Sequence, residues 1–256
     1  MKDGQWWDES WSPISGCTPV SEGCRFCWAK RMSKRLKGRY GYPADDPFKV
    51  TFHPDKVNGP LRWRKPRRIF VCSMSDFNHP DVEWNWQYKI IETMFVNPDH
   101  TYMVLTKRPE GFGKRLDDIY FHIGRNYGLN WDSGKAENYP FPLKNLWLGV
   151  TAENQQRADE RIPILLQIPA AVRFVSFEPL LSRIKAAKYA PKLDWAIIGC
   201  ESGAGRRQTD VDWIIDLKDT FVVYDKPVFI KQAEIAGKLI KMPKIDGREW
   251  NEYPKG

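Results

Sequence analysis

The chain has 256 residues, of which 42% are hydrophobic and 14% aromatic, and 40 Lys and Arg against 32 Asp and Glu give a net charge of +8. This composition excludes an intrinsically disordered chain, and no apolar run approaches the roughly 20 residues that cross a bilayer. The first residues also contain no apolar core of a secretory signal. We therefore expect a cytoplasmic protein that does not enter membranes.

Short apolar runs alternate with stretches that suit helices. The expected strands are a weak one in or just before residues 10–14, and then 68–73, 101–106, 146–151, 172–177, 195–200 and 227–231. The expected helices are 27–36, 84–96, 157–167 and 212–222. Apolar strands that alternate with helices form βαβ units with right-handed crossovers. The sequence therefore predicts an α/β fold, a partial (β/α)6-type barrel of TIM-like form.

We expect one domain over residues 1–256, because neither a repeat nor a Pro/Ser-rich linker divides the chain. Residues 111–142 are rich in Gly, Asn, Asp and aromatics, which predicts an insertion with one weak helix that acts as a lid or as a substrate-binding excursion. Residues 237–256 are expected to form a C-terminal cover with a hairpin turn at Asp246-Gly247.

A polar cluster follows each expected strand. The clusters are Ser73-Met74-Ser75-Asp76, Thr106-Lys107-Arg108, Thr151-Ala152-Glu153-Asn154, Glu178-Pro179, Glu201-Ser202-Gly203 and Lys231-Gln232. The active site of a (β/α) barrel is built from the loops at the C-terminal ends of its strands. These side chains are therefore expected to converge on one site.

The five cysteines divide into two groups, and their odd number argues against a disulfide framework. Cys72 and Cys200 end apolar runs, where a cysteine is expected to be buried in the core. Cys17, Cys24 and Cys27 have the spacing C-x6-C-x2-C, and grouped thiolates favour zinc or an iron–sulfur cluster. Zinc requires a fourth ligand, for which the candidates are His53, His79, His100 and His122. Three cysteines without a fourth ligand leave one iron of a cluster open.

This segment resembles the radical S-adenosylmethionine (SAM) superfamily, whose 4Fe–4S cluster is held by C-x3-C-x2-C with an aromatic residue before the last cysteine. Phe26 and the Cys24–Cys27 spacing match that motif, while the first spacing is longer by three residues. A narrower resemblance, to a phage and bacterial family of radical-SAM-like proteins with a GC…GC..C motif, covers nearly the whole chain. Its segments are WSPISGCTPVSEGCRFCWAKRM, FVCSMSDFNH, VLTKRPE, LWLGVTAENQ, FVSFEPLL, DWAIIGCESG, VFIKQ and DGREWNEYP.

The resemblance implies that Cys17, Cys24 and Cys27, in a loop after the first strand, hold a 4Fe–4S cluster that cleaves SAM to a 5′-deoxyadenosyl radical. It assigns Ser73, Ser75 and Asp76 to the amino group of SAM and Glu153 and Asn154 to its ribose. Lys107 or Arg108 would pair with the carboxylate of SAM or with a substrate anion. Thr106 is a further candidate cofactor contact. Glu178 and Glu201 are candidate catalytic residues at the barrel mouth. Alternatively, Asp76 caps a helix, Arg108 is a surface charge, and the two glutamates form ion pairs with Lys231 or Arg206.

Two basic segments, 30–39 and 62–68, and a pI near 9.2 favour nucleic acid as the substrate. The alternatives are a solvated helix face and a polar loop. The candidate nucleic-acid-binding residues are Arg62, Arg64, Lys65, Arg67, Arg108, Arg206 and Lys231.

The resemblance implies an isomerase that converts an amino-acid-modified thymine in phage DNA from an N-linked to a C-linked form. Such an enzyme flips the base out of the duplex and needs an external reductant such as flavodoxin or ferredoxin. One alternative is a DNA-lesion repair enzyme resembling spore photoproduct lyase. The other is a non-catalytic, zinc-stabilised nucleic-acid-binding protein.

Overall fold

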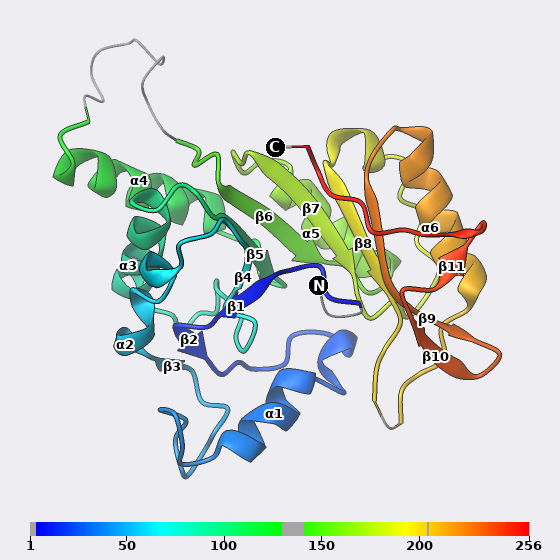
Figure 1. Cartoon of the computed structure of the whole chain (residues 1–256), viewed down its shortest axis with the longest axis horizontal. Helices are drawn as coiled ribbons and strands as arrows, with labels where there is room; N and C mark the ends of the chain where they lie inside the picture. The colour runs from blue at the N-terminus through cyan, green and yellow to red at the C-terminus, as the bar shows by residue number, and fades with distance from the viewer. Residues whose placement is uncertain (1–3, 130–140, 204, 256) are drawn as a thin grey trace.

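The computed structural model describes residues 4–129, 141–203 and 205–255. Its centre is an open, curled sheet with the strand order β1-β4-β5-β6-β7-β8-β9-β10, in which the neighbours from β1 to β9 are parallel and β10 is antiparallel to β9 (Figure 1). The strands are β1 (Glu9–Trp11), β4 (Arg68–Val71), β5 (Thr101–Thr106), β6 (Leu146–Thr151), β7 (Val172–Phe177), β8 (Trp195–Gly199), β9 (Val228–Ile235) and β10 (Lys238–Lys241). Two short strands, β2 (Ile14–Ser15) and β3 (Thr51–Phe52), pair beside the sheet.

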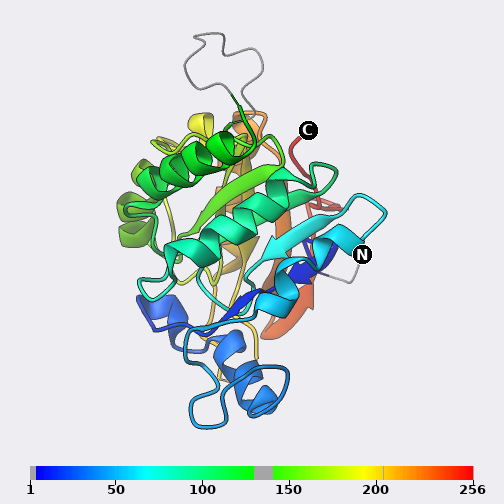
Figure 2. The same cartoon turned by 90° about the vertical axis from the view of Figure 1, so that its left-hand side faces the viewer.

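Helices connect successive parallel strands, as expected for βαβ units. The crossovers are α3 (Trp84–Phe95), α4 (Phe112–Asn126), α5 (Gln155–Leu165) and α6 (Val211–Val223), with the 3-10 turn η4 (Ala190–Lys192) between β7 and β8. The first part of the chain adds η1 (Glu22–Cys24), α1 (Trp28–Leu36), α2 (Pro54–Val57) and η2 (Pro60–Arg62). Figure 2 shows α3 and α4 side by side over the sheet. No helix in the described part of the chain has both the length and the apolar character needed to cross a membrane.

The sheet has one hydrophobic cluster on each face, and a third, small cluster lies beside α1. Side chains such as Val104, Leu148 and Ile198 pack with the crossover helices in the larger sheet cluster. The smaller sheet cluster is aromatic, and in it the buried Trp6 contacts Phe174 and Trp195 across the other face. Burial on both faces explains why these strands are almost continuously apolar.

The predicted strands 101–106, 146–151 and 172–177 match β5, β6 and β7. The strand β4 ends at Val71, two residues early, because Cys72 adopts a left-handed conformation with φ of 54°. The strand β9 extends to Ile235, beyond its predicted end, because it pairs with β10. A mixed α/β fold with a mostly parallel sheet is therefore confirmed.

Residues 111–142 differ from the expected insertion. Their first half forms α4, the crossover between β5 and β6, and it buries Leu116, Ile119 and Ile123 in the core. A helix packed on the core is not a lid; the helical spacing of its apolar residues was obscured by the polar composition around them. Residues 130–140 lie outside the described part of the chain. Near the C-terminus, Asp246 and Gly247, with φ of 54° and 80°, form the turn between β11 (Lys244–Ile245) and β12 (Arg248–Glu249).

Candidate functional site

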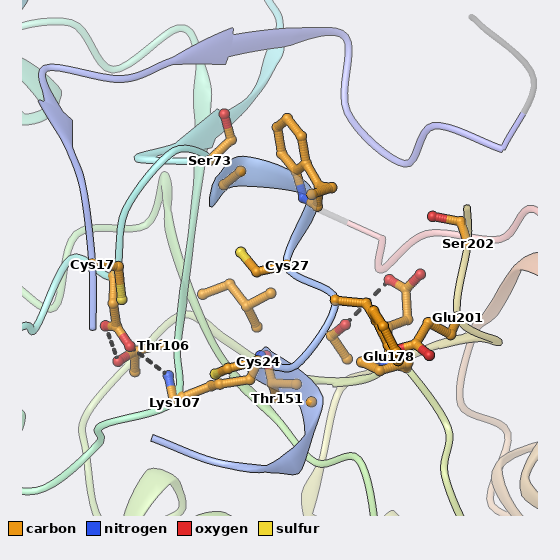
Figure 3. Close-up of a pocket in the computed structure, with 18 of the residues that line it drawn as sticks. Cys17, Cys24, Cys27, Ser73, Thr106, Lys107, Thr151, Glu178, Glu201 and Ser202 are labelled. Atoms are coloured by element: carbon orange, nitrogen blue, oxygen red, sulfur yellow. Dashed lines mark hydrogen bonds between the residues drawn. The ribbon is translucent and has the colours of Figure 1, made fainter. Parts of the chain in front are cut away.

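A cavity of about 230 Å³ lies at the C-terminal ends of the parallel strands. Most of the predicted site residues line it: Cys17, Cys24, Phe26, Cys27, Ser73, Ser75, Asp76, Thr106, Lys107, Arg108, Glu178, Glu201 and Lys231. In the view of Figure 3 the three cysteines lie toward one side of this cavity, and Glu178 and Glu201 toward the other. The polar clusters therefore converge on one cavity, although several of their side chains already form hydrogen bonds or ion pairs with other residues of the protein.

The backbone holds the cysteine loop against the sheet. The Gly16 N–H donates to the Met74 carbonyl, and the Cys17 N–H donates to the Phe48 carbonyl at 3.1 Å. Gly16 has φ of 87°, and a Cβ atom there would lie 2.0 Å from the Lys49 carbonyl oxygen, so this position requires glycine. The Cys27 N–H donates to the Cys24 carbonyl, and α1 begins at the next residue.

All three cysteines of this loop are half-buried free thiols. Within residues 4–129, 141–203 and 205–255, no group of three or more His, Cys, Asp or Glu side chains is placed to hold a metal ion. Three thiols from one loop nevertheless line one cavity, and cysteine sulfur is the donor that iron–sulfur clusters use. Holding a cluster would require the loop to bring its three sulfur atoms closer together.

Asp76 connects the loops that follow β4 and β5. Its carboxylate accepts hydrogen bonds from the Thr106 hydroxyl at 2.5 Å, the Lys107 backbone N–H at 3.0 Å and Arg108 Nη1 at 3.0 Å. It also accepts from the Asn78 backbone N–H. Asp76 and Thr106 are thus engaged with the protein, rather than free to accept from the amino group of SAM.

Arg108 is directed into the site and is not a surface charge. Its Nη1 lies 3.6 Å from Cys17 Sγ, and its Nη2 donates to the carbonyl and the hydroxyl of Thr18. Burial raises the pKa of the Cys17 thiol to about 11, and the nearby Asp76 carboxylate adds to this rise while Arg108 opposes it. Arg108 is therefore the cation that favours a thiolate at Cys17.

The two predicted serines also contact the first segment of the chain. The hydroxyl of Ser75 donates to the Gly16 carbonyl at 2.6 Å, and Ser73 Oγ lies 2.5 Å from Ser10 Oγ and 3.2 Å from Ser12 Oγ. Ser73 thus belongs to a chain of three hydroxyls at the cavity. Such a chain can both donate to and accept from a bound polar group.

Lys107 differs from the other cations of the cavity. Its side chain lines the cavity and is half-buried, and no carboxylate among the described residues lies within 4 Å of its ammonium group. A partly desolvated cation without an acidic partner attracts an anionic group of a ligand.

The two predicted glutamates form ion pairs at the cavity wall. Glu178 Oε1 lies 3.0 Å from Lys231 Nζ, as one of the sequence-based alternatives expected. Glu201 pairs with Arg207 instead of Arg206, which pairs with Glu234. Although burial raises the pKa of Glu201, hydrogen bonds from the Arg207 side chain and backbone hold it below its usual value. Glu201 is therefore held as the ionised partner of Arg207, and Glu178 forms its ion pair with Lys231.

Glu153 and Asn154 do not line the cavity. Glu153 is fully buried, lies 2.8 Å from Arg161, and accepts a long hydrogen bond from the Gly23 N–H in the cysteine loop. Asn154 caps α5 by accepting from the Arg157 N–H at 2.9 Å. These contacts explain both residues structurally, so the structure offers neither as a free ribose ligand.

The predicted nucleic-acid-binding residues lie in different places. Arg62, Arg64, Lys65 and Arg67 precede β4, so they lie at the N-terminal edge of the sheet, opposite the cavity. Arg67 is paired with Glu9 at 2.8 Å. Arg206 lies outside the cavity lining, while Arg108 and Lys231 lie inside it.

Sequence reasoning missed Arg161 and Arg207, the partners of Glu153 and Glu201. Arg207 also lies over the ring of Phe26, with 5.5 Å between its guanidinium carbon and the ring centroid. Only the tertiary fold brings these pairs together, and no local spacing indicates them. Cys72 and Cys200 are buried as predicted, but Cys200 also lines the cavity.

The chain has an open, mostly parallel α/β sheet with a cavity at the C-terminal ends of its strands, the edge at which (β/α) barrels carry their active sites. It belongs to the family described as "Protein of unknown function (DUF5131)", whose sequence profile matches residues 3–254. No curated protein and no solved structure matches the chain.

Proposed function

We propose that this protein is a radical SAM enzyme whose open sheet is a partial (β/α)6-type, TIM-like barrel. The observation that carries the proposal is that three free cysteines from one loop line a cavity at the C-terminal ends of parallel strands. Cys17, Cys24 and Cys27 would hold a 4Fe–4S cluster. The bound cluster and SAM would together supply a 5′-deoxyadenosyl radical.

The chain's own residues are suited to placing SAM and limiting water. Lys107, which has no acidic partner within the described residues, suits the carboxylate of SAM. The hydroxyl of Ser73, which lines the cavity and contacts the hydroxyls of Ser10 and Ser12, offers an acceptor for the amino group of SAM. Trp6, Trp7 and Phe70 supply apolar lining that limits water around a reactive radical.

The substrate that we propose is an amino-acid-modified thymine in phage DNA, which the enzyme would convert from an N-linked to a C-linked form. The support is the sequence resemblance together with the net charge of +8. Breaking an unactivated C–H bond is the kind of step that needs a radical cofactor.

Anaerobic reconstitution tests the chemistry. We expect about four irons per chain and, after reduction, 5′-deoxyadenosine from SAM. Cys24→Ala should lose both, whereas Cys72→Ala, which removes a buried thiol outside the cavity lining, should keep both. Stoichiometric zinc in place of iron, or equal behaviour of the two variants, would contradict the proposal. Mass spectrometry of nucleosides from treated phage DNA then separates isomerisation from lesion repair.

A further inference from the structure

Helix α1 has one buried face and one strongly basic face. Ala29 and Ser33 are buried, and Met32 and Leu36 pack with Tyr42 and Met74 in a small separate core. The opposite face and the residues after the helix are exposed and carry six cations: Lys30, Arg31, Lys34, Arg35, Lys37 and Arg39. We call these six residues the α1 basic surface.

The cations of the α1 basic surface form no close ion pair within the described residues, although the Asp45 carboxylate interacts with Lys37 over a longer distance. Residues 30–39 contain no acidic residue. Within the described residues, none of the six cations has a carboxylate partner within 4 Å. Unpaired cations close together on one surface create a positive potential that attracts polyanions.

The surface begins at the rim of the cavity. Trp28, the first residue of α1, lines the cavity and is 47% exposed. The Arg31 guanidinium packs against Gly203 in the loop after β8, where a Cβ atom would lie 2.6 Å from Arg31 Nη1. In Figure 1, α1 lies apart from α3, α4 and α6, which flank the sheet.

Exposed aromatic rings stand at both ends of this surface. Trp28 lies at its start, and Tyr40, which is 75% exposed, follows Arg39. Aromatic faces beside a row of cations suit stacked bases along a phosphate backbone. This combination favours a nucleic acid over a lipid surface. Anionic lipid headgroups would bind the cations, but they offer no bases to stack on the aromatic rings.

The second basic segment is placed differently. The Arg67 carbonyl accepts from the Thr101 N–H at the start of β5, and Trp63 packs beside His100, which precedes that strand. Both contacts fix residues 62–67 at the sheet edge opposite the cavity. A nucleic acid bound there would be separated from the cysteines by the length of the strands.

We propose that the α1 basic surface binds the sugar–phosphate backbone of a nucleic acid and presents it to the cysteine-lined cavity, and that residues 62–67 do not. This inference deepens the proposed function, on whose nucleic-acid substrate it rests. Trp28 would stack on an unpaired base at the cavity, and Tyr40 would stack on a base at the other end of the surface.

The test compares two matched pairs of exposed basic residues. Binding of a fluorescein-labelled 20-nucleotide single strand and of the corresponding duplex is measured by anisotropy between 50 and 300 mM salt. We expect Lys34→Gln/Arg35→Gln to weaken duplex binding about tenfold or more at about 0.1 M salt and to lower the salt slope by about 2. Arg62→Gln/Arg64→Gln should stay within about twofold of the wild type under the same conditions. Circular dichroism melting checks that both double variants fold. If Lys34→Gln/Arg35→Gln does not fold, the single variant Lys34→Gln replaces it.

Three results would overturn the proposal: equal loss in both pairs, loss only in Arg62→Gln/Arg64→Gln, or wild-type binding to phosphatidylserine vesicles without binding to either oligonucleotide. Iron content and SAM cleavage are measured on the same variants. If the wild type holds no cluster but binding still depends on Lys34 and Arg35, the radical SAM proposal fails and the nucleic-acid surface stands. If the cluster assembles but binding does not depend on Lys34 and Arg35, the proposal for the α1 basic surface fails and the radical SAM proposal stands.

Discussion

Arg108 Nη1 lies 3.6 Å from Cys17 Sγ, although 91 residues separate the two along the chain. The same guanidinium is fixed by Asp76, at 3.0 Å, and by Thr18. Burial raises the pKa of the Cys17 thiol and the cation opposes that rise, and the net pKa is about 11. The contact therefore links the loop after β5 directly to the reactivity of the first cysteine.

Replacing Arg108 should make Cys17 less reactive. Arg108→Gln removes the charge, so the pKa of the thiol rises further and the thiolate fraction at pH 8 falls. We expect several-fold slower alkylation of Cys17 by iodoacetamide in the metal-free protein, followed by peptide mass spectrometry. Arg108→Lys, which keeps the charge, should restore much of the rate. Faster or unchanged alkylation in Arg108→Gln would show that the guanidinium only blocks access to the sulfur.

The pair of Glu153 and Arg161 should contribute strongly to stability. Both side chains are buried, and Arg161 also donates to the Thr151 carbonyl. Glu153→Gln leaves the arginine charge without its partner, which should cost about 3–5 kcal/mol in the free energy of unfolding by urea. Glu153→Gln/Arg161→Met should recover much of that loss, because no unpaired charge remains.

The exposed pair of Arg183 and Asp216 provides the control for this cycle. Both side chains are about half exposed, so Asp216→Asn should cost less than about 1 kcal/mol. A similar cost at the two sites, or no recovery in the double variant, would mean that burial does not set the strength of the Glu153–Arg161 pair.

The strand positions could be predicted because a strand buried on both faces has an almost continuous run of apolar residues. The strand β6, for example, is buried at all six positions and appears as an apolar run. The helix α4 was expected only as a weak helix within an insertion, because the breaker residues around it outweighed the spacing of Leu116, Ile119 and Ile123. Apolar runs thus located the sheet more reliably than composition located the helices.

The candidate site could be predicted in its location but not in its contacts. The rule that sites lie at the C-terminal ends of parallel strands led to Lys107, Glu178 and Glu201, which all line the cavity. The same rule could not show that Asp76 is saturated by neighbouring donors or that Glu153 points away to Arg161. Such pairings depend on side-chain directions that only the assembled fold determines.

Gly149 in β6 should tolerate no larger side chain. A Cβ atom there would lie 2.4 Å from the ring of Phe174, its buried register partner in β7. Gly149→Ala should therefore lower the free energy of unfolding by about 1–3 kcal/mol through overpacking. Combining it with Phe174→Leu should cost less than the sum of the two single changes.

A second glycine separates packing from backbone effects. Gly113 lies in α4, where a Cβ atom would meet Ile168 at an ordinary 3.4 Å. Gly113→Ala should be neutral or raise stability by up to about 1 kcal/mol, since alanine favours the helix. Equal losses at Gly149 and Gly113 in urea titrations would contradict the packing argument.

His53 should make the fold less stable in mild acid. Its side chain is only 3% exposed, its Nε2 lies 2.7 Å from Ser15 Oγ, and burial, followed by the nearby Lys56, lowers its pKa to about 4. In the unfolded chain the pKa of His53 is near 6.5. As the pH falls below 6.5, the unfolded chain therefore binds a proton at His53 while the folded chain does not. The folded state loses stability over the range from pH 6.5 down to pH 4. The loss of stability at His53 should be about 2 kcal/mol between pH 7 and pH 5.

His53→Gln should remove this part of the pH dependence in urea titrations. The smaller part due to His79, whose pKa burial also lowers, should remain. His122→Gln, at a half-exposed site on α4, controls for the loss of an imidazole. A pH dependence unchanged in His53→Gln would mean that burial does not keep His53 neutral in the folded protein.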